Sequence, residues 1–185
     1  MEQDDLAVAL TKGFALDSSF GYGATNYEID FTDESGPSKL VGGSEGGAFQ
    51  VAMDAARMLM SGGGKNVAVT ITSAQLPFPE LKLAYAESGF ALTMPLTKGD
   101  APQEFSFLTK LVDLTVSDEV WAMFDPTASL PRDPATVIVD TKGTTTLGAD
   151  LMADGDADPI SQAALNSLDI TELRAKFAGA EMTGT

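Results

Sequence analysis

Apolar and polar residues alternate with a period of two along most of this chain. The alternating stretches lie at 14–16, 20–22, 27–31, 67–71, 81–85, 90–96, 112–116, 137–139 and 173–177. Such alternation is typical of strands with one buried and one solvated face, because successive side chains of a strand point to opposite sides. It predicts a mainly β protein, with a long curved antiparallel sheet (a meander, a half-barrel or a groove) and two short helices.

The breaks between these stretches contain residues that favour turns. They are Asp33–Pro37, Gly42-Gly43, Gly62–Gly64, Glu87–Gly89 and Lys142-Gly143. Since glycine, proline and aspartate supply the backbone conformations of tight turns, we expect hairpin loops at the glycine clusters 42–47 and 62–65. Neither cluster fits a phosphate-binding loop; Gly62–Lys65, for example, is followed by Asn66 instead of serine or threonine.

Two segments are predicted to be helical. Ser117 is placed as the N-cap of a helix that includes 120–124 and ends at Asp125-Pro126. Asp158-Pro159 opens a second helix, over 160–165, with proline at the first helical position. Residues 51–60 combine helix-favouring composition with strand-like alternation, and the alternation favours a strand.

The composition excludes several classes of function. Among 185 residues there is no histidine and no cysteine, and 27 acidic against 11 basic residues give a net charge of −16. Nucleophiles activated by histidine, thiolate catalysis, disulfides and zinc sites built from histidine or cysteine are therefore excluded. So acidic a chain is also a poor partner for nucleic acid or for anionic membrane surfaces. What remains is carboxylate, lysine or tyrosine chemistry, or no chemistry.

One string resembles a catalytic loop without matching it. Residues 140–144, Asp-Thr-Lys-Gly-Thr, are similar to the phosphorylated-aspartate loop of P-type ATPases, but lysine and threonine are transposed. We expect a hairpin turn centred on Lys142-Gly143 instead, with glycine supplying a positive φ.

A second string has the beginning of a calcium loop. Asp154, Asp156 and Asp158 stand at the first, third and fifth positions, but Pro159 and Leu165 occupy the positions that require glycine and glutamate. We expect a solvated acidic loop here. The sequence as a whole predicts no catalytic residue, no metal site and no cofactor, and hence a protein that is not an enzyme.

Six aromatic residues form the candidate ligand-binding set. They are Phe78, Phe90, Phe105, Phe107, Trp121 and Phe124. One interpretation places them in a packed core, as is usual for large apolar side chains. The other places them along an apolar ligand groove, with the rigid bend at 75–79 on its rim.

A long segment resembles an uncharacterised family of alphaproteobacterial envelope proteins that share a domain of unknown function. The segment runs from Pro102 through Trp121 and Asp125-Pro126 to Gly143, and its most specific part is the run 130–136, Leu-Pro-Arg-Asp-Pro-Ala-Thr. The similarity extends to 168–173 and 179–185, and in looser form it covers nearly the whole chain.

This resemblance implies a place for the protein in the cell. Members of the family carry an N-terminal secretion signal and further β sequence, which implies a periplasmic or outer-envelope location. The family is similar to AsmA-type proteins, whose curved sheets form an apolar groove implicated in lipid movement, and it has no established catalytic residues to carry over. Because the alternation from 170 runs to Thr185 without a recognisable turn, we expect residues 1–185 to be a single β-rich domain and part of a longer chain.

Three hypotheses of function follow. The first is a non-enzymatic envelope protein that binds lipid or another hydrophobic ligand in a β-groove. The second is a structural or assembly component that binds a protein partner of the envelope through a sheet edge or an apolar patch. The third is a carboxylate-dependent hydrolase, which requires two acids about 5–10 Å apart in a cleft. No nucleic-acid partner is expected, and no apolar run is long enough for a transmembrane helix.

Overall fold

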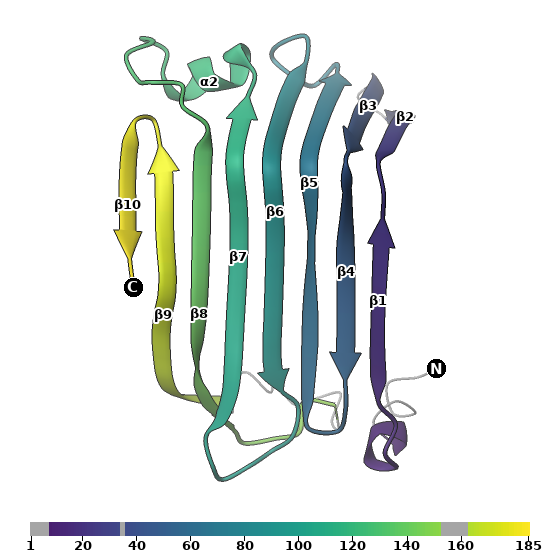
Figure 1. The fold of residues 1–185 in the computed structure, drawn as a ribbon. Coiled ribbons are helices and arrows are strands. Elements are labelled where there is room, and N and C mark those ends of the chain that lie inside the picture. Colours follow the sequence, from purple (N-terminus) through teal and green to yellow (C-terminus); the bar gives the residue numbers. More distant parts are fainter. Residues whose placement is uncertain (1–7, 34–35, 153–162) are drawn as a thin grey trace.

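A computed structural model describes residues 8–33, 36–152 and 163–185 of the chain. Within them, ten strands form one antiparallel sheet (Figure 1). The strands are β1 (Leu16–Tyr22), β2 (Thr25–Asp33), β3 (Gly36–Ser44), β4 (Gly46–Met53), β5 (Arg57–Ser73), β6 (Leu81–Pro95), β7 (Gln103–Val116), β8 (Ala135–Leu147), β9 (Ala163–Phe177) and β10 (Ala180–Gly184). The predicted mainly β fold with a long antiparallel sheet is confirmed.

The sheet is a meander in which each long strand pairs with the next one along the chain. From β5 to β10 the spatial order equals the chain order. At the other edge, β3 and β4 pair with successive parts of β5, β2 pairs with β3, and β1 pairs with β4. Thus β1–β2 and β3–β4 are two long strands, each interrupted once. The sheet stays open, with separate edges at β1–β2 and at β9–β10.

The predicted helix after Ser117 is confirmed, whereas the second predicted helix is wrong where it can be compared. Helix α2 spans Asp118–Phe124, with Ser117 at its N-cap position, although the serine side chain makes no capping hydrogen bond. Residues 163–165 belong to β9, because they pair with 145–147 of β8. Residues 160–162 and the calcium-like string at 154–158 lie outside the described residues. The other described helical segment is 8–11.

The segment 51–60 is strand, as its alternation predicts, with a tight turn inside it. Asp54 makes this turn: its carboxylate accepts hydrogen bonds from the N–H groups of Ala56 (2.8 Å) and Arg57 (2.9 Å). A hairpin also joins Asp33 to Gly36, as predicted. The end of the chain does contain a turn: Ala178 and Gly179 both have positive φ and connect β9 to β10.

The glycine clusters predicted as hairpin loops are in fact inside strands. Gly62–Gly64 lies in β5, Gly89 in β6, and Gly143 in β8, so the predicted turn at Lys142-Gly143 is also wrong. Within 42–47 only Glu45 interrupts the strands, between β3 and β4.

At several of these glycines the physical reason is that an aromatic ring of the neighbouring strand covers them. The directly opposed pairs are Tyr27–Gly42, Tyr22–Gly47, Phe49–Gly62, Phe90–Gly62 and Phe105–Gly143. A Cβ on Gly62 would lie 2.9 Å from the Phe90 ring and 3.1 Å from the Phe49 ring. An aromatic ring laid over a cross-strand glycine protects the backbone that the missing side chain leaves bare.

Apolar positions change phase along one line across the sheet. In β5 the apolar side chains that alternate have even residue numbers before Asn66, as at Met58 and Met60. After Asn66 they have odd residue numbers, as at Val67 and Val69. Asn66 has a left-handed backbone, with φ of 48°. An irregularity of this kind resets the alternation of a strand and bends it.

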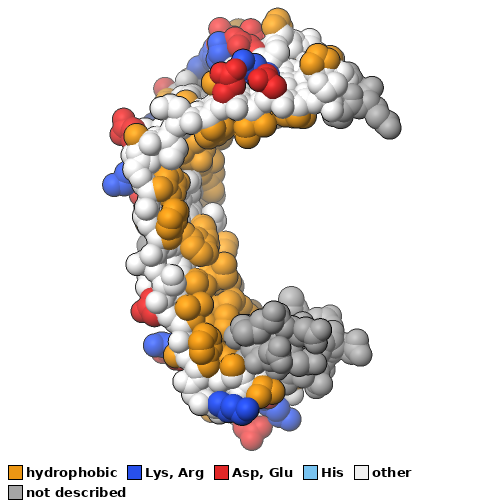
Figure 2. All heavy atoms as spheres, turned by 90° about the vertical axis from the view of Figure 1, so that its right-hand side faces the viewer, with side chains coloured by type: hydrophobic (Ala, Val, Ile, Leu, Met, Phe, Trp, Pro, Cys, Tyr) orange, Lys and Arg blue, Asp and Glu red, His pale blue; other side chains and the backbone are white. Residues whose placement is uncertain are grey.

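The same line continues through the neighbouring strands. Lys65 pairs with Glu87, and Glu87 pairs with Val112, next to Asp113, whose φ is 55°. The register between β7 and β8 shifts at this place. Figure 2 shows the result: the sheet curves along its strands into a C, with hydrophobic side chains on the inside of the curve.

The sheet is a single layer with very little buried core. Among the described residues the buried apolar side chains are Leu10, Leu96, Trp121 and Leu147. The chain exposes 11539 Å² of surface, whereas a folded monomer of 19.3 kDa exposes about 8,500 Å². The difference reflects an apolar face that no second layer of the described residues covers.

Replacing Gly143 by alanine is expected to lower the free energy of unfolding by about 1–3 kcal/mol, as overpacking does. A Cβ there would overlap the carbonyl oxygen of Ser167 and lie 2.9 Å from the Phe105 ring. The control is Gly21→Ala, where the nearest atom would be 3.9 Å away. Urea unfolding of both variants measures the difference, and equal unfolding midpoints would contradict the account.

Candidate ligand groove

The inside of the curve is built from rows of residues that lie side by side across the strands. Cross-strand partners share a face, so the printed register defines each row. One row is Phe20, Phe49, Gly62, Phe90, Thr109, Val139 and Leu173. The next is Ser18, Val51, Met60, Leu92, Phe107, Thr141 and Ile170. We call the face that carries these rows the concave face.

Two further rows extend the concave face on either side. They are Leu16, Met53, Met58 and Met94, and Tyr22, Gly47, Gly64, Ser88, Leu111, Val137 and Ala175. No carboxylate, ammonium or guanidinium group occurs in any of the four rows. Large side chains in them are open to solvent, Phe20 by 66%. The concave face is therefore a continuous apolar surface without a charged group in its centre.

The structure brings five of the six predicted aromatic residues to apolar surface. Phe90 and Phe107 lie in the central rows and are 40% and 41% exposed, so they do not fill a closed core. Phe105 lines an apolar cavity at one end of the sheet, while Trp121 and Phe124 line another at the opposite end. Phe78 lies in the loop between β5 and β6 and lines neither of these two cavities.

Sequence reasoning missed several central residues of the concave face. Phe20 and Phe49 lie directly opposite each other, and the Phe49 and Phe90 rings flank Gly62 with centroids 6.2 Å apart. The signal was present in the alternation of 16–22 and 49–53. The alternation alone does not predict that these residues lie together, because it does not say which strands are neighbours or in which register they pair.

Helix α2 encloses an apolar cavity of about 480 Å³ against the end of the sheet, which we call the α2 cavity. It is lined by Leu114, Thr115, Val116, Val120, Trp121, Phe124, Arg132, Asp133, Ala135 and Phe177. Phe177 continues the alternate positions Leu173 and Ala175 of the concave face, and its ring contacts Trp121 with centroids 5.4 Å apart. The cavity is thus an extension of the concave face.

A second apolar cavity, of about 450 Å³, lies at the other end of the strands. It is lined by Leu92, Met94, Pro95, Phe105, Thr145, Leu147, Leu151, Ala163 and Leu165. Leu92 and Met94 are members of the concave rows, so this cavity also continues the concave face. The apolar surface therefore has a deeper region at each end.

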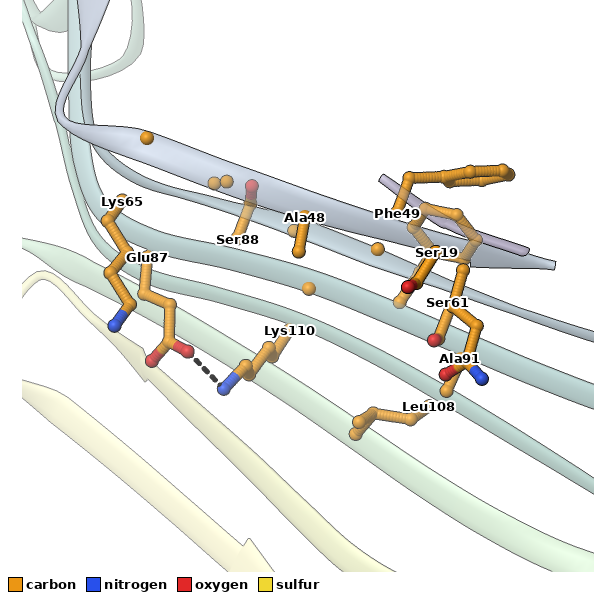
Figure 3. Close-up of a pocket in the computed structure, with 18 of the residues that line it drawn as sticks. Ser19, Ala48, Phe49, Ser61, Lys65, Glu87, Ser88, Ala91, Leu108 and Lys110 are labelled. Carbon is orange, nitrogen blue, oxygen red and sulfur yellow. Dashed lines mark hydrogen bonds and ion pairs between the residues drawn. The ribbon is translucent and has the colours of Figure 1, made fainter. Parts of the chain in front are cut away.

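The opposite, convex face of the sheet carries a shallow trough of about 730 Å³ (Figure 3). Its floor contains small residues, among them Ala48, Gly63 and Gly89, and its side contains the ion pair between Lys110 and Glu87. Figure 3 shows Lys65, Glu87 and Lys110 on the side of the strands away from Phe49. The two faces of the sheet are thus chemically distinct, and these charged side chains lie on the convex face.

A smaller cavity of about 420 Å³ also opens on the convex face. Glu104 and Asp169 both line it, and Lys142 lies on the strand between them. The hydrolase hypothesis requires such a pair of acids. It stays a prediction, and Glu104→Gln and Asp169→Asn are the substitutions that would test it.

Two other kinds of feature are absent from the described residues. None of the groups formed there by aspartate and glutamate contains three residues placed to hold a metal ion. No helix of the described segments is long and apolar enough to cross a membrane.

Asp125 holds the loop that follows α2. Its carboxylate accepts hydrogen bonds from the Leu130 N–H (2.7 Å) and from the hydroxyls of Thr127 (3.1 Å) and Ser129 (3.2 Å), while its own N–H donates to the Trp121 carbonyl. The Leu130 N–H, followed by the other donors, lowers the pKa of Asp125. This loop keeps α2, and with it Trp121, in place over the cavity.

Comparison of the chain with protein-family models, with curated proteins and with solved structures gave no match.

Asp125→Asn is expected to lower the melting temperature near neutral pH, because the amide loses the charge that strengthens these three hydrogen bonds. A lowered pKa in the folded state contributes stability above the ordinary aspartate value of about 3.9 and loses it as the pH falls through the lowered pKa. The gap between wild type and variant should therefore be full above about pH 4 and close below it. A gap independent of pH would contradict this assignment.

Proposed function

We propose that the protein is a non-enzymatic carrier or binding protein for lipid, with the apolar chain of the ligand lying along the concave face. The observation that carries the proposal is the apolar face itself, which is exposed along the whole sheet and has a cavity at each end. Burying such a surface is worth about 25 cal/mol per Å². A soluble monomer rarely leaves a patch of this size uncovered unless something binds to it.

The composition of the face favours an acyl chain over a protein surface. Protein interfaces make about one hydrogen bond per 100–200 Å² and have a polar rim. The four concave rows contain serine and threonine as their polar members, apart from the Tyr22 hydroxyl, and no charged side chain. A hydrocarbon chain needs no hydrogen-bond partner and can lie along such a surface in either direction.

The cellular place that we propose is the periplasm or the outer envelope. It rests on the resemblance to the alphaproteobacterial envelope family and on the similarity of that family to AsmA-type proteins. The curved single-layer sheet is consistent with this resemblance. In such a compartment an exposed apolar face can take up lipid between two membranes.

A second candidate function is assembly with a protein partner of the envelope through a sheet edge. Strand β10 pairs with 173–177 of β9 and leaves 163–172 without a neighbour on that side among the described strands. Unpaired strand edges are templates for an added strand. Since the chain contains no cysteine, a photo-crosslinker on Asp169→Cys labels this edge alone. One stoichiometric cross-linked partner favours assembly, and none counts against it.

The direct test of the lipid proposal is the content of the purified protein. Native mass spectrometry and solvent extraction should find lipid bound to the chain isolated from an envelope fraction. The uncharged apolar probe N-phenyl-1-naphthylamine should bind to the delipidated protein with increased fluorescence. Purified protein that consistently contains no lipid and does not bind the probe would contradict the proposal.

Phe107→Glu is expected to weaken binding of this probe about tenfold or more, because an ionised carboxylate on the ligand surface has to be desolvated. The matched control is Ser106→Glu, which adds the same charge at the adjacent position on the convex face. Its affinity should stay within about twofold of wild type, a small fraction of the 1.4 kcal/mol that a tenfold change represents. Circular dichroism melting checks that both variants are folded. Equal losses in the two variants would contradict binding on the concave face.

A further inference from the structure

One side of the sheet ends in strands β1 and β2, which together we call the β1–β2 edge (Figure 1). β1 pairs with β4 and β2 pairs with β3, and neither has a second neighbour among the described strands. The pairing is regular over the whole of 16–22 and 25–33. A regular edge presents a row of backbone N–H and C=O groups with which an added strand can pair.

The β1–β2 edge lacks the features that commonly prevent strand addition, which are lysine, proline and bulges. Neither strand contains lysine, arginine or proline, and neither shifts its register against its partner. All of β1 is exposed, and so are residues 25–32 of β2. At the opposite edge, β9 shifts its register against β8 twice, and irregularities of this kind bend a strand. The β1–β2 edge is therefore the more regular template.

On the concave side, β2 presents an apolar side chain at every second position. Two rows of cross-strand partners end at this edge: Tyr27, Gly42, Val69, Leu83 and Val116, and Ile29, Leu40, Ile71 and Leu81. Val116 lines the α2 cavity, so these rows belong to the concave side. Ile29 and Phe31 are 49% and 48% exposed. An added strand with apolar residues at alternate positions would cover these side chains and extend the rows by one residue.

On the convex side, the same edge carries carboxylates. Glu28 and Asp30 alternate with the apolar residues of β2, and Asp17 has the corresponding place in β1. Lys39 of β3 lies directly opposite Asp30 and forms an ion pair with Glu28, so one ammonium group faces two carboxylates. Opposite charges on neighbouring strands stabilise their pairing, and like charges destabilise it. The edge therefore favours basic residues at the remaining positions of an added strand.

The opposite edge of a second copy does not offer such a strand. Segment 163–172 of β9 and strand β10 contain Asp169, Glu172 and Glu181 and no lysine or arginine. Pairing the two edges would place carboxylates beside carboxylates, in addition to the repulsion between two chains of net charge −16. The charge of the β1–β2 edge thus favours a different chain.

We infer that the β1–β2 edge binds, by strand addition, an extended segment of another protein in which apolar and basic residues alternate. The backbone of the segment pairs with β2, its apolar side chains lie beside Ile29 and Phe31, and its basic side chains lie beside Glu28 and Asp30. Backbone pairing supplies affinity in this mode of recognition, and the alternate side chains supply specificity. This interaction does not depend on lipid binding.

The probe is a fluorescein-labelled peptide of nine residues, the length of β2, in which valine and lysine alternate. One control peptide has glutamate in place of lysine, and the other has the same valines and lysines in two separate blocks. Fluorescence anisotropy with the full chain should show that the alternating basic peptide binds about tenfold or more tightly than either control. Its binding should also slow hydrogen exchange of the backbone amides in 25–33.

Asp30→Lys replaces an attraction by a repulsion and should weaken binding of the basic peptide about tenfold. The matched control, Asp169→Lys, makes the same change of charge at the opposite edge, and its affinity should stay within about twofold of wild type. Because the substituted lysine lies opposite Lys39 and opposes the pairing of β2 with β3, Asp30→Asn is the second variant. It removes the charge without reversing it and should weaken binding about threefold.

Each result either supports or contradicts the inference. If the peptides bind equally or not at all, or if both lysine variants lose affinity equally, the inference is wrong. If Asp169→Lys alone loses affinity, the peptide binds at the other edge and the inference is again wrong. If the chain sediments as a dimer in which exchange of 25–33 is already slow without peptide, a second copy occupies the edge instead. None of these results bears on the binding of lipid to the concave face.

Discussion

In the described part of the chain the sheet keeps its shape without a second layer packed on its apolar face, and the rest of this structure depends on how it does so. The backbone ladder between long neighbouring strands supplies most of the connections, with β5–β6 and β8–β9 paired over almost their full lengths. Aromatic rings laid over opposed glycines, such as Phe49 and Phe90 on Gly62, add cross-strand contacts that need no other layer. Contacts between neighbouring strands therefore stabilise the sheet, and its apolar face remains exposed for a ligand.

Curvature turns this available face into a site. The irregularities at Asn66 and Asp113 lie on one line across the sheet, where the alternation changes phase, so apolar residues continue along the inside of the C (Figure 2). Ionisable side chains such as Lys110 and Glu87 lie on the convex face. A net charge of −16 also opposes the stacking of two copies, which would otherwise bury the same surface.

The fold was predictable from the sequence to the extent that it depends on local alternation. The period of two predicts the strands and their two faces, and α2 begins where Ser117 and the following acids predict it. Local chemistry predicts turns at the glycines of 62–64 and at Gly143, whereas Gly62 and Gly143 lie in strands beneath the rings of Phe90 and Phe105, which come from other strands. For the same non-local reason the aromatic set was predictable as residues, but its division between the rows and the α2 cavity required the register.

The central claim, that ligand lies on the concave face, can be tested most directly with the methionine methyl groups. Met53, Met58, Met60 and Met94 lie in the concave rows, while Met123 lies on α2 and is 66% exposed. In a ¹³C-methyl methionine spectrum, an acyl chain carrying a nitroxide near its middle should broaden the four concave signals and leave Met123 much less affected. Broadening confined to Met123, or broadening of none of the five signals at a saturating concentration of ligand, would contradict the account.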